Sequence, residues 1–136
     1  MSNNRADDAA AIQAVLALSY KAWEAGDAEG MVADYTADAT AIMTGSFRDS
    51  RDAVSENMAL AFDGPLKGNS TYNKQLSLRF LGRDAAIVVS ESGILFPGQT
   101  EVPDTGKVKA TWVFEKRDGK WLIAAYHNSP SLAPAQ

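Results

Sequence analysis

The segment that most constrains the fold is "KVKATWVFEKRDGKWLIAAYHN", residues 107–128. It contains two apolar runs joined across residues 117–120, and the Asp-Gly pair within that junction favours the tight turn of a β-hairpin. Side chains alternate between the two faces of a strand, so the first run puts four apolar residues on one side: Val108, Ala110, Trp112 and Phe114. The sequence therefore predicts an antiparallel pair with one strongly apolar face that other elements must cover.

The second run of this hairpin is apolar on both faces. Simple alternation puts one set on one side (Trp121, Ile123, Ala125 and His127) and a second set opposite (Leu122, Ala124, Tyr126 and Asn128). Such a strand is typical of one that is buried on both sides. Helices can cover one face of a small sheet and a second copy of the chain can cover the other, so we expect a homodimer through the sheet.

Residues before the hairpin predict helices first and strands afterwards. Apolar residues at helical spacing predict a helix over 7–25, with Asp7 and Asp8 at its cap and first turn. We expect a short second helix after Asp27, a short strand over 37–45, and a third helix from residue 49 or 50 to residue 63. Residues 71–98 predict two strands that reverse at 82–84.

This order predicts an α+β fold in which three N-terminal helices pack on a curved, mostly antiparallel sheet of four or more strands. The length of 136 residues fits one domain over 1–136, with an ordered core over about 6–130. The tail that starts at Ser129 has no periodicity and is expected to be mobile. The polar segment 97–106 fits either a lid over a pocket or an ordinary connection.

Composition excludes several classes of function. A net charge of −4 disfavours nucleic acid and anionic membrane surfaces as partners. There is no cysteine and only one histidine, so a thiol nucleophile or a metal site with several histidines is excluded, and we expect no metal. No Gly-rich dinucleotide turn is present, so we expect no cofactor. The N-terminus has no signal-peptide core, which predicts a cytoplasmic protein.

Three stretches carry a family resemblance that covers about residues 6–130. The stretch "WEAGDAEGMVADYTADAT" (23–40) resembles the signature of nuclear transport factor 2-like domains. The stretches "FLGRDAAIVVSESG" and "VFEKRDGKWLIAAYHNSP" are similar to the later strands of the SnoaL-like branch, and most similar to its SgcJ/EcaC subfamily. The resemblance implies a cystatin-like cone whose helices and concave sheet enclose a pocket, with a dimer through the convex sheet. It also implies an association with polyketide or enediyne antibiotic biosynthesis.

The known chemistry of ketosteroid isomerase-like relatives does not transfer to this chain. The position of their general-base aspartate falls on Met43, and that of their oxyanion-hole tyrosine falls on Ser19. Tyr20 is one residue away, but one residue turns a helix by roughly 100° and aims its hydroxyl elsewhere. A methionine cannot take a proton, so that mechanism is excluded.

The residues that remain for acid–base work are His127 and Glu91, with Asp38 as a third candidate that also suits a turn. His127 fits three roles: an acid or base, a polar group in a pocket wall, or a residue that ends a strand. We favour the wall. The expected ligand-binding residues are Ser19, Tyr20, Trp23, Tyr35, Met43, Phe47, Met58, Phe62, Trp112, His127 and Asn128. Several of these large side chains would serve equally well as core.

Three functions follow as hypotheses. The leading one is a protein of secondary metabolism that holds a hydrophobic polyketide- or enediyne-type intermediate, with other biosynthetic enzymes as expected partners. The second is a cyclase, isomerase or dehydratase that uses His127 as acid or base. The third is a structural adaptor that acts through the sheet.

Overall fold

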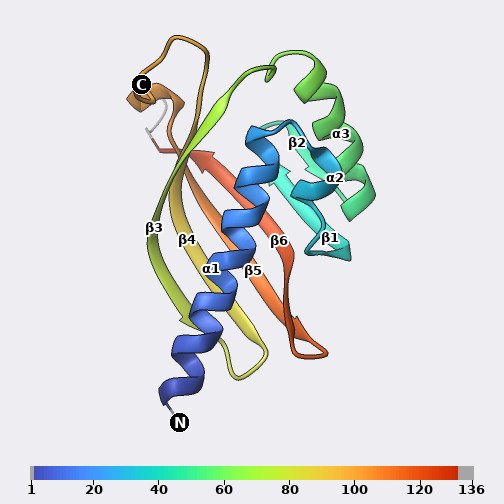
Figure 1. The fold of residues 1–136 in the computed structure, drawn as a ribbon, viewed down its shortest axis with the longest axis vertical. Coiled ribbons are helices and arrows are strands. Elements are labelled where there is room, and N and C mark those ends of the chain that lie inside the picture. Colours follow the sequence, from blue (N-terminus) through green and yellow to red (C-terminus); the bar gives the residue numbers. More distant parts are fainter. Residues whose placement is uncertain (1, 132–136) are drawn as a thin grey trace.

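The computed structural model of this protein describes residues 2–131. Its elements follow in the order α1 (Ser2–Glu24), α2 (Ala28–Met31), β1 (Tyr35–Met43), β2 (Ser46–Arg48), α3 (Arg51–Asp63), β3 (Ser70–Phe80), β4 (Ala85–Leu95), a short 3-10 helix η1 (Asp104–Gly106), β5 (Val108–Arg117) and β6 (Lys120–Pro130). Figure 1 shows α1 lying across one face of the sheet, with α2 and α3 beside its upper end. The predicted α+β architecture is confirmed.

The six strands form one sheet in the order β2-β1-β6-β5-β4-β3. All neighbouring pairs are antiparallel except β1 and β6, which run parallel. The predicted β5–β6 hairpin turns at Asp118 and Gly119, which both adopt positive φ (52° and 77°). Two successive residues of positive φ give the type of turn that matches the twist of a hairpin, which is why Asp-Gly marks it so clearly.

The core lies between the helices and the concave face of the sheet. Ile12 and Leu16 of α1 pack there with Val88, Phe114 and Ile123 from three strands. The third helix begins where its cap was expected, because the Ser50 side chain accepts a hydrogen bond (3.0 Å) from the backbone N–H of Ala53.

The start of α1 differs from the prediction. The helix begins at Ser2, so Asp7 and Asp8 are not its cap. Asp8 instead accepts hydrogen bonds from Trp121 Nε1 (3.0 Å) and Lys116 Nζ (3.3 Å). The carboxylate therefore ties α1 to the β5–β6 hairpin, a tertiary use that helix-cap patterns do not distinguish from capping.

The end of β6 also differs. The strand continues through Ser129 to Pro130, which pairs with Val108 at the start of β5. Pro130 has no N–H to donate to the ladder, and the strand ends at this residue. Residues 132–136 of the predicted mobile tail lie outside the described part of the chain.

Candidate functional site

A cavity of about 370 Å³ lies between the helices and the concave sheet. All three helices and all six strands contribute to its wall, together with the segment between β4 and β5. Its volume is in the range of small-molecule sites, and most of its lining is aliphatic, aromatic or thioether. Eight of the residues expected to bind a ligand line it: Ser19, Tyr20, Trp23, Tyr35, Met43, Met58, Trp112 and Asn128.

His127 is not among the lining residues. Its side chain is exposed, and the residue pairs with Thr111 on the convex face of the sheet. Trp112 and Tyr126, which line the cavity, lie on the other face. The expectation that the imidazole faces the pocket is therefore wrong.

The cause is a β-bulge in β6. Ile123 pairs with Phe114 and Ala125 pairs with Val113, so Ala124 is an extra residue without a partner. One extra residue exchanges the two faces of everything that follows it. Trp121 and Ile123 thus face the core as predicted, whereas beyond the bulge the inward positions pass to Tyr126 and Asn128.

The strand β2 was not predicted, and its presence shows that a second expected binding residue, Phe47, points away from the cavity. Phe47 pairs with Ile42 on the convex face and is 65% exposed, so it does not line the cavity. Its neighbour Arg48 pairs with the buried Ala41 and reaches the cavity instead. If residues 46–48 had been recognised as a strand, the alternation of side chains would have placed Arg48 on the face opposite to Phe47.

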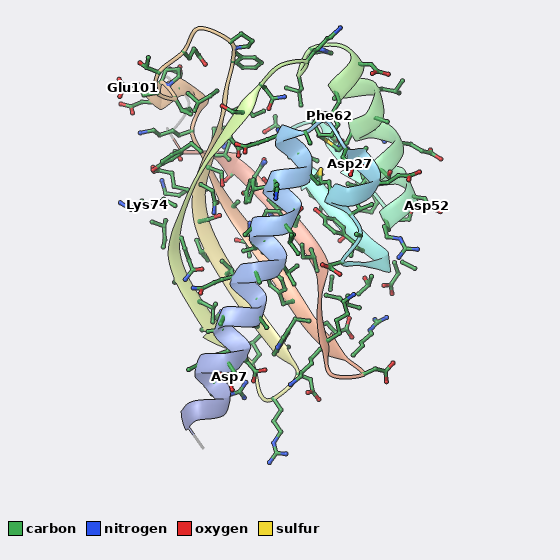
Figure 2. The ribbon with its side chains drawn as sticks, viewed as in Figure 1. Asp7, Asp27, Asp52, Phe62, Lys74 and Glu101 are labelled. Atoms are coloured by element: carbon green, nitrogen blue, oxygen red, sulfur yellow. The ribbon has the colours of Figure 1, made fainter. Side chains whose placement is uncertain are left out.

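Phe62 is a core residue that does not line this cavity, although it lines a second hollow. It is 7% exposed and packs edge-on against the indole of Trp23, with ring centroids 5.5 Å apart. Figure 2 shows Phe62 near the end of α3, where this helix meets the end of α1. A second, smaller hollow of about 280 Å³ lies there, and Trp23 lines both hollows.

Glu91 also lies away from the cavity. Its carboxylate accepts a hydrogen bond from Tyr72 (3.1 Å) and is paired with Lys109 at 3.2 Å. These hydrogen bonds, that from Lys109 most of all, lower the pKa of Glu91, so it is an ionised surface carboxylate. Asp38 is an exposed residue within β1 rather than a turn residue, and it too lies outside the lining.

Three of the polar residues that line the cavity are tyrosines. Burial raises the pKa of the hydroxyls of Tyr20, Tyr35 and Tyr126, so all three stay protonated at neutral pH. The Tyr126 hydroxyl accepts a hydrogen bond from Asn128 Nδ2 at 2.7 Å. The Ser19 hydroxyl is already used, since it donates to the backbone carbonyl of Met31 at 2.9 Å.

Tyr20 belongs to a polar cluster where α1 crosses β3 and β4. Its hydroxyl donates to Asn73 Oδ1 at 3.1 Å and lies 3.4 Å from the Ser92 hydroxyl, which itself donates to Asn73 at 3.2 Å. These bonds fix the orientation of the Tyr20 ring against Trp112, whose centroid is 6.1 Å away. The cluster thus makes one wall of the cavity rigid.

The segment between β4 and β5 closes one end of the cavity. Phe96, Gln99, Pro103 and Gly106 from this segment line it. The Gln99 side chain accepts a hydrogen bond from the backbone N–H of Phe96 at 2.9 Å, which folds the segment back on itself. The segment is therefore part of the cavity wall.

The described residues offer little that would hold a metal ion. Across residues 2–131, no three side chains of histidine, cysteine, aspartate or glutamate lie together as ligands. In the same part of the chain, no helix is long and apolar enough to cross a bilayer.

The comparisons with known proteins agree with this architecture. The SnoaL-like domain model matches residues 12–134, and the chain belongs to this family. No curated protein sequence matches it significantly.

Several solved structures share the fold. A domain of unknown function with a cystatin-like fold from Nostoc punctiforme is 26% identical (TM-score 0.86; 93% of this chain and 79% of that chain covered). A nuclear transport factor 2-like protein with a cystatin-like fold from Novosphingobium aromaticivorans is 16% identical (TM-score 0.82; 98% and 88% covered). A protein provisionally assigned as a scytalone dehydratase, from the same organism, is also 16% identical (TM-score 0.76; 97% and 89% covered). The chain thus has a cystatin-like fold.

Proposed function

We propose that this protein binds an apolar, flat small molecule of the polyketide type in the cavity between its helices and its sheet. The observation that carries the proposal is the lining itself. Among the described residues that form it there is no aspartate, glutamate, histidine or lysine. The rings of Trp112 and Tyr126 pack against each other at a tilt of 48°, with centroids 4.3 Å apart, and Met58 also lines the cavity. Aromatic and thioether side chains of this kind suit a flat apolar ligand.

Binding is favoured over proton-transfer catalysis because a base must reach the reacting atom. His127 and Glu91 are on the other side of the sheet from the cavity. The tyrosines that do line it are protonated at neutral pH, so they are donors rather than bases. The cyclase, isomerase or dehydratase alternative therefore has no base among the described lining residues.

The finer placement in the SgcJ/EcaC subfamily belongs to this proposal. It is supported by the run "WLIAAYHN" (121–128) within β6. Under it, the ligand is a polyketide- or enediyne-type intermediate, and other enzymes of the same pathway supply and collect it.

The experiment is a titration of the purified protein with dihydroxyanthraquinone, followed by quenching of tryptophan fluorescence. Ala61 of α3 lines the cavity, and Ala61→Trp would place an indole in the space that the ligand occupies. Leu60 is its neighbour but is 75% exposed and lies outside the lining, so Leu60→Trp is the matched control.

Saturable binding in the wild type and in Leu60→Trp, with at least tenfold weaker binding in Ala61→Trp, supports the proposal. Circular dichroism checks that both variants fold. Absence of saturable binding in the wild type, or equal binding by all three proteins, contradicts it.

We propose as well that a second copy of the chain covers the convex face. The register gives a row across all six strands: Phe47, Ile42, His127, Thr111, Val89 and Ser77. A parallel row contains Thr40, Ala125, Val113 and Ile87. Charged residues flank these rows, as in the Lys109–Glu91 pair. An apolar centre with a charged rim is the pattern of a protein interface, and His127 would lie within it.

Light scattering after size-exclusion chromatography tests this dimer. Val113→Glu puts a charge in the middle of the face and should give a monomer, because an unpaired buried charge is costly. Leu60→Glu makes the same kind of change on α3 and should leave the dimer intact. A monomeric wild type, or a Val113→Glu variant that remains a dimer, contradicts the proposal.

A further inference from the structure

The only charged side chain among the described residues that line the cavity is Arg48 of β2. It is partly buried, and burial lowers the pKa of its guanidinium, which still remains charged. A cation placed in an otherwise apolar cavity is expensive unless an anion or several acceptors surround it.

Arg48 has no such partner within residues 2–131. Its Nη1 donates only to the Met58 sulfur at 3.2 Å, and thioether sulfur is a weak acceptor. Its Nε is buried and has no hydrogen-bond partner. None of the ion pairs in this part of the chain includes Arg48.

The surroundings of Arg48 add a hydroxyl donor and an aromatic surface. Arg48 pairs with Ala41, Ala41 with Tyr126, and Tyr126 with Trp112, so the four form one row on the concave face. In this row the small Ala41 stands between Arg48 and the two aromatic rings, which pack against each other at a tilt of 48°. Tyr35 lines the same cavity, and its hydroxyl stays protonated, so it is a potential donor.

We propose that the ligand of this cavity carries an anionic oxygen group, a carboxylate in the simplest case, which binds the guanidinium of Arg48 while its flat apolar body lies on Trp112 and Tyr126. This inference rests on the proposed binding function and names the chemical class of the ligand. An arginine fork binds a carboxylate through two parallel N–H···O bonds, which gives both affinity and orientation. The net charge of −4 repels anions from the protein as a whole, so a preference for an anion has to come from this local site.

The test compares two probes of the same shape, anthracene carboxylate and anthracene carboxamide, at pH 7.5. Three proteins are titrated by isothermal calorimetry: wild type, Arg48→Met and Arg83→Met. The methionine keeps much of the length of the arginine stem and removes only its charge and donors. Arg83 is exposed in the turn between β3 and β4, so Arg83→Met changes the net charge equally but lies outside the cavity lining.

We expect the wild type and Arg83→Met to bind the carboxylate at least about tenfold more tightly than the carboxamide, as hydrogen bonds to charged groups allow. In Arg48→Met this preference should disappear while the carboxamide affinity stays within about threefold of wild type. If the wild type binds both probes with equal affinity, the inference is overturned. It is also overturned if the preference for the carboxylate persists in Arg48→Met. Both results leave the proposed binding function standing. Binding of neither probe by the wild type overturns the binding function and the inference together.

Discussion

Replacement of Asp8 by alanine tests how α1 is fixed over the sheet. The Asp8 side chain is only 17% exposed and accepts bonds from Trp121 Nε1 (3.0 Å) and from Lys116 Nζ (3.3 Å). Trp121 is 3% exposed, so Asp8→Ala leaves a buried indole N–H without an acceptor. The variant loses a hydrogen bond to a charged acceptor and leaves a buried donor unpaired. Such a loss lowers the free energy of unfolding by about 2 kcal/mol.

Asp7 supplies the matched control. It is the preceding residue of the same helix, its side chain is exposed, and Figure 2 shows it near the N-terminal end of α1. Exposed substitutions away from special contacts change stability by no more than about 0.5 kcal/mol. For a chain of this length, a loss of 2 kcal/mol lowers Tm by about 6–8 °C, whereas Asp7→Ala should leave it almost unchanged.

Urea unfolding and differential scanning calorimetry of the three proteins measure these differences. The pH dependence adds a second check. The hydrogen bond from Trp121 is the main cause that lowers the pKa of Asp8 below its ordinary value of 3.8. The stabilisation is therefore fully present above pH 3.8 and is lost as the pH falls through the lowered value in the folded protein. The reasoning is refuted if Asp7→Ala costs as much as Asp8→Ala, or if the cost of Asp8→Ala does not shrink below pH 3.8.

Two further predictions concern packing on α1 and the cap of α2. Ile12→Ala should lower the free energy of unfolding by about 2–5 kcal/mol, because Ile12 is 0% exposed. Leu18 is 59% exposed, so Leu18→Ala should lower it by less than about 0.5 kcal/mol. Equal costs would contradict the assignment of the core face of α1. A Cβ at Gly30 would overlap the carboxylate of Asp27, which accepts the Gly30 N–H at 2.9 Å. The cost of Gly30→Ala should therefore be about 1–2 kcal/mol lower in an Asp27→Ala background than in the wild type, measured as the coupling in a double-mutant cycle. The same effect of Gly30→Ala in both backgrounds would show that the cap is not formed.

The elements with strong local signals could be predicted from the sequence. The Asp-Gly turn, the alternation along β5 and the Ser50 cap of α3 each depend on residues close together in the chain. The place of the cavity in the fold could be predicted for the same reason. An amphipathic helix and a strand with one apolar face pack with their apolar sides toward each other, so a cavity between them has an apolar lining. That is why most of the expected lining residues do line the cavity.

The orientation of His127 could not be predicted because both faces of β6 are apolar. A bulge at Ala124 exchanges the faces without breaking any hydrophobic pattern, and only the register with β5 reveals it. Arg48 was missed for a related reason, since β2 has three residues and a strand that short has almost no alternation to detect. The use of Asp8 depends on Trp121, which is 113 residues away in the chain.

The measurement that tests the central claim most directly is a crystal structure of the protein grown with dihydroxyanthraquinone. The account predicts density for the ring system inside the cavity, in contact with Met58 of α3 and Trp112 of β5, with the helices in their present places. Density for the ligand only on the convex face, or a cavity closed by its own side chains beside a ligand bound elsewhere, would contradict it.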